Sequence, residues 1–202
     1  CIKVYYERIL LIRTRKLFSL ENTSVKLDTI VYLANNDLGV IHTIESKYFN
    51  LNKAQNYFEE TGFSEYIFGQ SNCGVFYNYF CSNKKEKALY QFQKSAEKNF
   101  SLAEYNLGYL YEIDGEISKA INYYSNASNH EDFVIRLFGE IMIDNRLEIS
   151  KTFICCLANL KLIRYYMSKS DFKLAKNFFI RMINQLEKEY IKYKSILEID
   201  KN

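Results

Sequence analysis

A chain of 202 residues is long enough for one compact domain or for a short array of roughly five or six helix pairs. Hydrophobic residues make up 48% of it, which excludes a disordered chain, and no apolar run approaches the roughly 18 to 20 residues needed to cross a bilayer. The net charge is +3 and acidic and basic residues alternate along most of the chain, which indicates a solvated surface rather than a nucleic-acid footprint.

The first predicted element is a helix within residues 2–20. Its apolar residues recur with lysines and arginines between them, a pattern typical of a partly buried helix. Because the chain begins with Cys1 and not with Met, we expect it to be processed or to be part of a longer product.

Residues 24–68 are predicted to form a degenerate helix pair. Leu38 and Gly39 fall in its first helix, and Ala54 and Phe58 fall in its second. Their spacing matches that of a clearer unit at residues 101–132 after an expansion of three residues in the loop.

Residues 69–100 form the next predicted unit, 32 residues before the clearest one. Matching positions hold Val75, Tyr79, Asn83, Ala88 and Phe92. Phe76 stands where the clearest unit has a glycine, so we expect the spacing between the two helices to differ here.

The clearest unit covers residues 101–132. Leu107 and Tyr111 are four residues apart and share one face of a first helix. Gly108 and Ala120 are small where two helices must approach closely, and Gly115 can adopt positive φ between them. The buried stripe of the second helix continues through Tyr124 and Ala127.

This unit resembles the tetratricopeptide repeat family, whose unit of about 34 residues has small and large residues at the same positions. The string from Ala103 to Gly108 is also similar to the start of the related Sel-one-like repeat. That family usually has a longer loop between its glycine and the second-helix alanine. The resemblance implies an all-α fold, a right-handed solenoid of antiparallel helix pairs, forming one domain over residues 1–202.

The C-terminal part contains a second degenerate unit and a further repeat. Residues 133–155 read as helical but are too short for a full unit. Residues 156–189 match again, with Ile163 in place of the glycine. The matching residues in this repeat are Leu162, Tyr166, Ala175, Phe179 and Met182. A long helix over residues 172–197 is predicted to cap the solenoid.

The sequence offers little for catalysis, and we expect no enzyme activity, no metal and no cofactor. Its two histidines, His42 and His130, are near no nucleophile in a recognisable motif. The seven glycines form no phosphate-binding loop, and the five cysteines have no zinc-site spacing. Cys155 and Cys156 would point about 100° apart on a helix, so we interpret both as buried structural residues.

The family resemblance implies a concave groove lined by first-helix residues. These predicted partner-binding residues are Tyr77, Phe80, Leu102, Tyr105, Tyr109, Glu112 and Arg164. The groove would be aromatic rather than basic, which disfavours a receptor for acidic chaperone tails. Tyr and Phe can anchor a partner helix or an extended peptide. The alternative is that these side chains pack within the chain itself.

We therefore expect a non-catalytic scaffold or adaptor, a subunit of a larger assembly with a protein partner and no membrane insertion. A cytoplasmic location is favoured. One alternative is a Sel-one-like adaptor of ER-associated degradation, which requires a missing signal peptide and glycans on Asn22, Asn99 or Asn126. Another is an RNA-associated helical repeat protein, in which a basic run contacts phosphates. That run consists of Lys84, Lys85 and Lys87.

Overall fold

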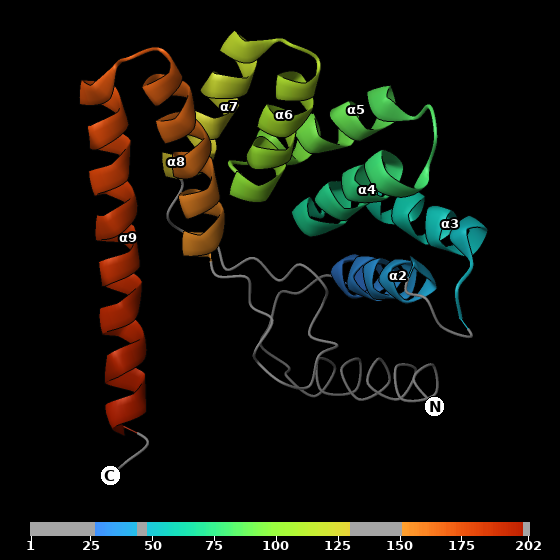
Figure 1. Ribbon diagram of the computed structural model, residues 1–202. Coiled ribbons are helices and arrows are strands. Elements are labelled where there is room, and N and C mark those ends of the chain that lie inside the picture. The colour runs from blue at the N-terminus through green and yellow to red at the C-terminus, as the bar shows by residue number, and fades with distance from the viewer. Residues whose placement is uncertain (1–26, 44–47, 130–150, 200–202) are drawn as a thin grey trace. The chain divides into compact units, whose positions relative to one another are not determined.

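The computed structural model describes residues 27–43, 48–129 and 151–199. They form eight α-helices and no strand, which confirms the all-α prediction for the described residues (Figure 1). The helices are α2 (Leu27–Thr43), α3 (Leu51–Gly62), α4 (Ile67–Phe80), α5 (Lys85–Ala96), α6 (Ser101–Ile113), α7 (Ile117–Asn129), α8 (Lys151–Ser168) and α9 (Phe172–Ile199). The predicted helix within residues 2–20, His130 and residues 133–150 lie outside the described residues.

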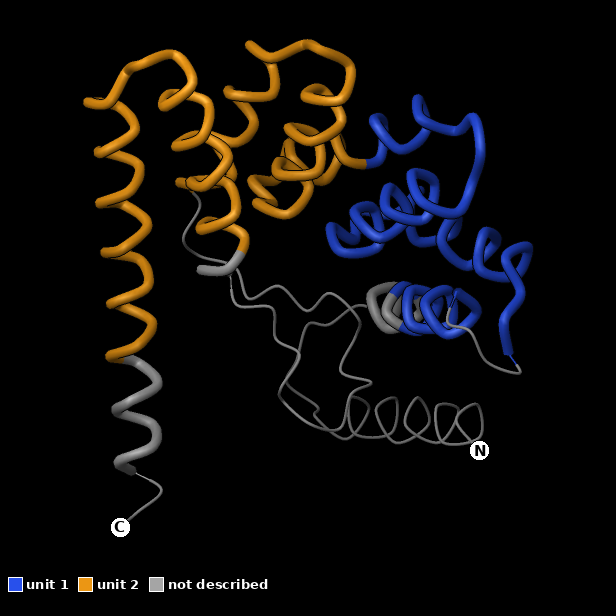
Figure 2. The backbone as a smooth tube through the Cα atoms, in the orientation of Figure 1, with its two compact units in different colours: residues 1–91, 136–147 blue, residues 92–135, 148–202 orange. Residues whose placement is uncertain are grey.

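The described residues divide into two compact units, with the division inside α5 (Figure 2). In unit 1, α3 packs against both α2 and α4, and α2 also contacts α4. In unit 2, α6 packs against α7, α7 against α8 and α8 against α9, and α6 also contacts α8. Both units therefore have a repeat-like arrangement, in which neighbouring helices pack in pairs and the first helices of successive pairs touch.

The turn between the two helices of a pair has the same backbone form in successive pairs. Gly115 has φ of +77°, as the sequence predicts, and its N–H donates to the carbonyl of Glu112 at 3.1 Å. The next N–H, that of Glu116, donates to the carbonyl of Tyr111 at 2.9 Å. These two bonds satisfy carbonyls at the end of α6 that would otherwise lack a partner.

A glycine is not present at every such turn. Asn83 has φ of +62° after α4, at the position that the sequence aligned with Gly115. Ser170 has φ of +57° after α8, and the N–H of Asp171 donates to the carbonyl of Tyr166 at 2.9 Å. Asn tolerates this conformation better than Ser does, so the α8–α9 turn carries the most backbone strain of the three.

Close approach between the helices of a pair depends on glycine facing an aromatic ring. A Cβ placed on Gly108 would lie 2.7 Å from Cδ1 of Tyr124, and one on Gly39 would lie 2.8 Å from Cε1 of Phe58. Both distances are too short for a real contact. The spacing match between residues 24–68 and 101–132 therefore corresponds to the same packing in the structure.

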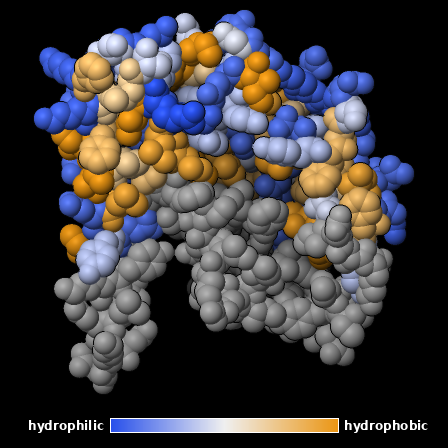
Figure 3. All heavy atoms as spheres, in the orientation of Figure 1, coloured by the Kyte–Doolittle hydropathy of each residue, from blue (hydrophilic) through white to orange (hydrophobic). Residues whose placement is uncertain are grey.

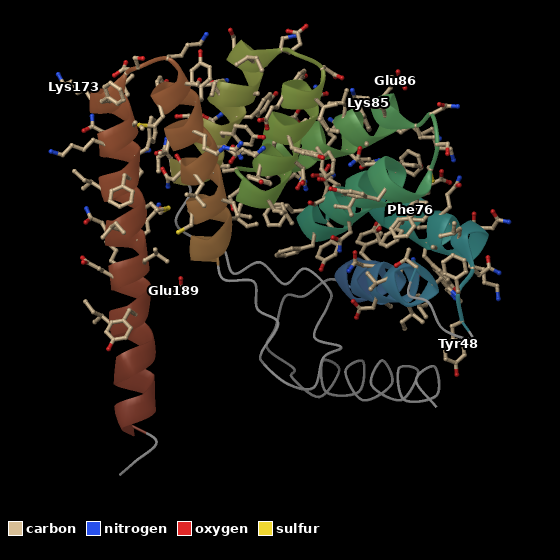
Figure 4. All side chains as sticks on the ribbon, in the orientation of Figure 1. Tyr48, Phe76, Lys85, Glu86, Lys173 and Glu189 are labelled. Carbon is tan, nitrogen blue, oxygen red and sulfur yellow. The ribbon has the colours of Figure 1, made fainter. Side chains whose placement is uncertain are left out.

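Phe76 shows how a large side chain is accommodated at the glycine position of α4. Its ring is buried and packs against Phe58 at 5.2 Å and Phe80 at 5.7 Å between ring centroids. The aromatic rings of α3 and α4 thus form a stack within unit 1, and Figure 4 shows Phe76 among these side chains.

The α8–α9 pair corrects one sequence assignment. Phe179 was expected in the buried stripe of α9, but its side chain is half exposed. Phe178 packs instead, with its ring stacked on Tyr166 at 5.5 Å. The α6–α7 pair has an equivalent stack, between Tyr111 and Tyr123, also at 5.5 Å.

Adding a side chain at Gly108 should destabilise the protein, although Ala is the better helix former. Tyr124 is buried, and a Cβ on Gly108 would lie only 2.7 Å from its ring. We expect Gly108→Ala to lower the free energy of unfolding by about 1–2 kcal/mol, because overpacking outweighs the gain in helix propensity. Asn122→Ala, at an exposed position of α7, is the matched control and should change it by less than about 0.5 kcal/mol. Chemical denaturation measures both, and a more stable Gly108→Ala variant would contradict the packing argument.

Relieving the strained turn should stabilise the protein. Ser170→Gly is expected to raise the free energy of unfolding by about 0.5–1 kcal/mol, because glycine adopts positive φ without steric cost. The reverse exchange, Gly115→Ser, should lower it by a similar amount, since a Cβ there meets open space and only the backbone term changes. Thermal and urea unfolding measure the change in unfolding free energy for both variants. A change of the same sign in Ser170→Gly and Gly115→Ser would contradict the prediction.

Candidate partner-binding surface

Four of the predicted groove residues of unit 2 lie on α6 and α8, two helices that contact each other. Tyr105, Tyr109 and Glu112 recur on one face of α6, and Arg164 lies on the facing part of α8. Leu160 and Met167 flank Arg164 at helical spacing. We call this surface the α6–α8 face, and it consists of Tyr105, Tyr109, Glu112, Leu160, Lys161, Arg164 and Met167.

Glu112 is the polar centre of the α6–α8 face. Its Oε2 accepts a hydrogen bond from the Tyr124 hydroxyl at 2.5 Å and another from the Lys161 ammonium at 2.6 Å. Partial burial by itself would raise the pKa of Glu112. The two hydrogen bonds and the positive charges of Lys161 and Arg164 outweigh burial, so the pKa of Glu112 lies below its ordinary value.

Tyr124 contributes the hydroxyl group of this polar centre. Burial, followed by the hydrogen bond to Glu112 and the charge of that carboxylate, raises the pKa of the Tyr124 phenol well above its ordinary value. The hydroxyl therefore stays protonated and acts as a donor. Its ring belongs to the core cluster with Ala120 and Leu162, so the polar centre rests on packed side chains.

Lys161 joins three helices at this point. Its Nζ lies 5.6 Å from the ring centroid of Tyr109 on α6 and 5.7 Å from that of Tyr124 on α7, besides its ion pair with Glu112. Only about a quarter of its side chain is exposed, at 23%. A cation over aromatic rings and beside a carboxylate is fixed in place, so Lys161 orients the α6 side chains relative to α8.

The outer part of the α6–α8 face is accessible. Leu160 and Met167 are 45% and 50% exposed, and Arg164 between them is also exposed. Tyr105 and Tyr109 are half-buried, with the Tyr105 ring 5.5 Å from that of Tyr124. The face thus presents apolar and aromatic side chains around an exposed guanidinium on a fixed base.

The other predicted groove residues lie elsewhere. Leu102 is buried near the start of α6, and Tyr77 is buried in unit 1. The Tyr77 hydroxyl donates to Oε1 of Glu59 at 2.6 Å, so both its ring and its hydroxyl are used within the chain. Phe80 is partly exposed on the aromatic stack of α4. The structure therefore brings together Tyr105, Tyr109, Glu112 and Arg164, but not Tyr77 or Leu102.

The basic run is partly engaged within unit 1. Lys84 donates to Oε1 of Gln55 at 3.0 Å, and Lys87 pairs with Glu59 at 3.8 Å. Both ammonium groups lie over the Tyr77 ring, at 5.5 and 5.3 Å from its centroid. These lysines help to hold the Tyr77–Glu59 contact, which is one structural role for the run.

Sequence reasoning missed Lys161 and the hydroxyl of Tyr124. The helical register contains a signal for Lys161, because it precedes Leu162, which the repeat pattern assigns to the core. A lysine beside a core position must run along the neighbouring helix surface before its ammonium reaches water. Tyr124 was recognised only as a core ring.

The described residues contain no cluster of three or more His, Cys, Asp or Glu side chains placed to bind a metal ion. Within the same residues, no helix combines the length and hydrophobicity that crossing a bilayer requires. No family model matches the sequence, and no curated protein or solved structure is significantly similar to it.

The polar centre gives a pH-dependent prediction. Because the folded state lowers the pKa of Glu112, its contribution to stability is full above the ordinary pKa of 4.5 and is lost as pH falls through the lower folded value. Glu112→Gln should cost about 1 kcal/mol of unfolding free energy at neutral pH, a value that allows for partial exposure. The difference between wild type and variant should shrink at acid pH.

Urea denaturation over a pH series measures this difference. Glu116→Gln on the exposed turn is the control, since Glu116 is exposed and its ion pair with Lys119, at 3.3 Å, is exposed as well. A pH-independent difference for Glu112→Gln, or an equal effect in both variants, would show that the polar centre does not stabilise the fold.

Proposed function

We propose that the chain is a tetratricopeptide-type helical repeat scaffold that binds a segment of another protein on the α6–α8 face. The observation that carries the proposal is the exposure of Leu160 and Met167 beside Tyr105 and Tyr109, around a fixed polar centre. Binding sites of this kind bury apolar and aromatic anchors and use a few fixed polar groups for orientation.

The repeat-like packing supports the family part of the proposal. Small residues facing aromatic rings and turns with positive φ recur between pairs, as the tetratricopeptide resemblance implies. We propose that successive pairs continue as a right-handed solenoid of antiparallel helices, in which the first helices line the inner surface.

The chemistry of the face indicates the kind of segment it would bind. Leu160, Met167 and the edges of the two tyrosines favour a helix or extended peptide with apolar side chains. Arg164 is exposed, and it can form a bidentate pair with a carboxylate of the partner. The proposed partner segment is therefore apolar with at least one acidic residue, rather than the acidic tail of a chaperone.

A binding role is favoured over catalysis by the state of Glu112. Its carboxylate is held ionised and is already engaged by Lys161 and Tyr124. A group in this state orients neighbouring side chains but is poorly placed to accept or release protons near neutral pH.

The alternatives from sequence stay predictions, as does the cytoplasmic location. Lys84 and Lys87 contact Glu59, Gln55 and Tyr77, so no observation favours their use for RNA phosphates over this structural role. Of the sequons for an ER adaptor, Asn99 is exposed and Asn126 is half-buried, while Asn22 lies outside the described residues.

Affinity purification of the tagged chain from its native cells, followed by mass spectrometry, should recover a protein partner. We then expect Leu160→Glu with Met167→Glu to weaken binding of the recovered partner by about tenfold or more in a purified titration, since buried anchors dominate such interfaces. Phe63→Glu, at the most exposed large apolar side chain described, is the matched control and should bind as wild type does.

Circular dichroism should show equal helix content in all three proteins, because the substituted side chains are exposed. Arg164→Glu should also weaken the interaction, and more so at low salt. Unchanged binding by the Leu160→Glu, Met167→Glu protein would reject the α6–α8 face as the binding surface.

A further inference from the structure

One face of α9 carries large apolar side chains that the described residues leave exposed. Phe172, Phe179, Leu186 and Tyr190 are 62%, 50%, 45% and 69% exposed. They are 7, 7 and 4 residues apart, so they form one stripe along the helix. Figure 3 shows exposed apolar residues along this part of the molecule. We call these four residues the α9 stripe.

The packed side of α9 lies about a quarter turn around the helix from the α9 stripe. Phe178 stacks on Tyr166, and Gln185 accepts from Asn159 at 3.0 Å and donates to the Ser128 carbonyl at 3.0 Å. Arg181 donates to Asn129 at 2.6 Å. Contacts with α7 and α8 therefore fix the orientation of the helix, and the α9 stripe lies beside these contacts on a face that the described residues leave exposed.

The corresponding face of α7 indicates which kind of element can cover the α9 stripe. A shift of 55 residues aligns Ala120 with Ala175 and Tyr124 with Phe179. Tyr124 is buried, and Leu162 of the following helix packs against it in the same cluster. Phe179 thus stands where α7 carries a ring covered by another helix. The α9 stripe is a surface that fits a helix.

Charges beside the stripe indicate which helix fits. Lys173 and Lys176 lie near the start of α9, and Glu187 lies on the same side about three turns later; all three are exposed. Figure 4 shows Lys173 on the side of α9 away from α8 and Glu189 on the side toward α8. The free flank of the stripe is therefore basic at one end and acidic at the other.

This charge pattern is complementary to itself when reversed. Consider two copies of α9 that run antiparallel, with Lys176 of each opposite Glu187 of the other. Phe172 of one copy then lies within one residue of Tyr190 of the other. Phe179 then lies opposite Asn184, one residue from Ile183. In a parallel pair, by contrast, like charges would face each other. A two-fold interface requires this kind of self-complementary surface.

We propose that the α9 stripe is a self-association surface, on which a second copy of this chain packs its own α9 in antiparallel orientation. The two-fold axis crosses the helix level with Arg181 and Met182. This contact is separate from the α6–α8 face, so a dimer can form with or without a partner bound there.

Light scattering after size exclusion, on the full chain over a concentration series, tests the proposal. The wild-type mass should rise toward twice 24.0 kDa. Phe179→Glu and Leu186→Glu should each raise the dissociation constant about tenfold or more, because a charge would be buried in the interface. Phe63→Glu and Leu160→Glu, at exposed apolar positions outside α9, are the controls and should associate as wild type does.

Charge exchange tests the orientation. Lys176→Glu alone and Glu187→Lys alone should each weaken the dimer several-fold, roughly 2- to 10-fold, because each replaces attraction by repulsion at two related places. The combined exchange restores the pair in an antiparallel dimer and should recover association to near the wild-type value.

Three results would overturn the proposal. One is a monomer at every concentration, including a monomer whose α9 stripe binds a different protein. The second is a dimer that forms equally well with Phe179→Glu and Leu186→Glu while circular dichroism shows an intact fold. The third is a combined charge exchange that fails to recover association, which would contradict the antiparallel register. Because Leu160→Glu is a control here and the test variant for partner binding, the two surfaces can fail independently.

Discussion

The close approach of a helix pair at a glycine facing an aromatic ring determines much of what the described residues do. Gly108 leaves room for the ring of Tyr124, and Gly39 does the same for Phe58. With its ring packed against Gly108, Tyr124 places its hydroxyl within hydrogen-bond distance of Glu112, one turn further along α6. Glu112 in turn holds Lys161, which spans from α8. The polar centre of the α6–α8 face therefore follows from a packing constraint inside the α6–α7 pair.

Unit 1 has an aromatic ring, Phe58, at the position that Tyr124 occupies in unit 2, but this ring cannot donate a hydrogen bond. Phe58 has no hydroxyl, so the carboxylate in this unit, Glu59, is reached instead by Tyr77 from α4. Lys87 approaches that carboxylate from α5 at 3.8 Å, a looser ion pair than the one at Glu112. Each unit thus has a tyrosine, a carboxylate and a lysine in contact among its described residues.

The helix pairs and the main packing position could be predicted from sequence because both depend on local spacing. Gly108, Ala120 and Tyr124 sit at fixed offsets, and Gly115 takes the positive φ that its place in the turn requires. Ser170 adopts nearly the same φ, yet no propensity rule selects serine for it. Tertiary packing of α8 against α9 imposes that conformation, so a pattern search based on glycine overlooks it.

Exposure was the harder property to predict, because it depends on which helix comes next rather than on the residue. Tyr124 and Phe179 occupy equivalent positions, but Leu162 packs against the first and leaves it buried, while the second is half exposed. Among the groove residues, Tyr77 is similarly buried where Tyr109 is accessible, although the two are 32 residues apart in the same register. A repeat pattern therefore identifies candidate surface positions, and the neighbouring helix decides which of them can bind another chain. This dependence also explains why the α6–α8 face and the α9 stripe are two distinct surfaces built from the same unit.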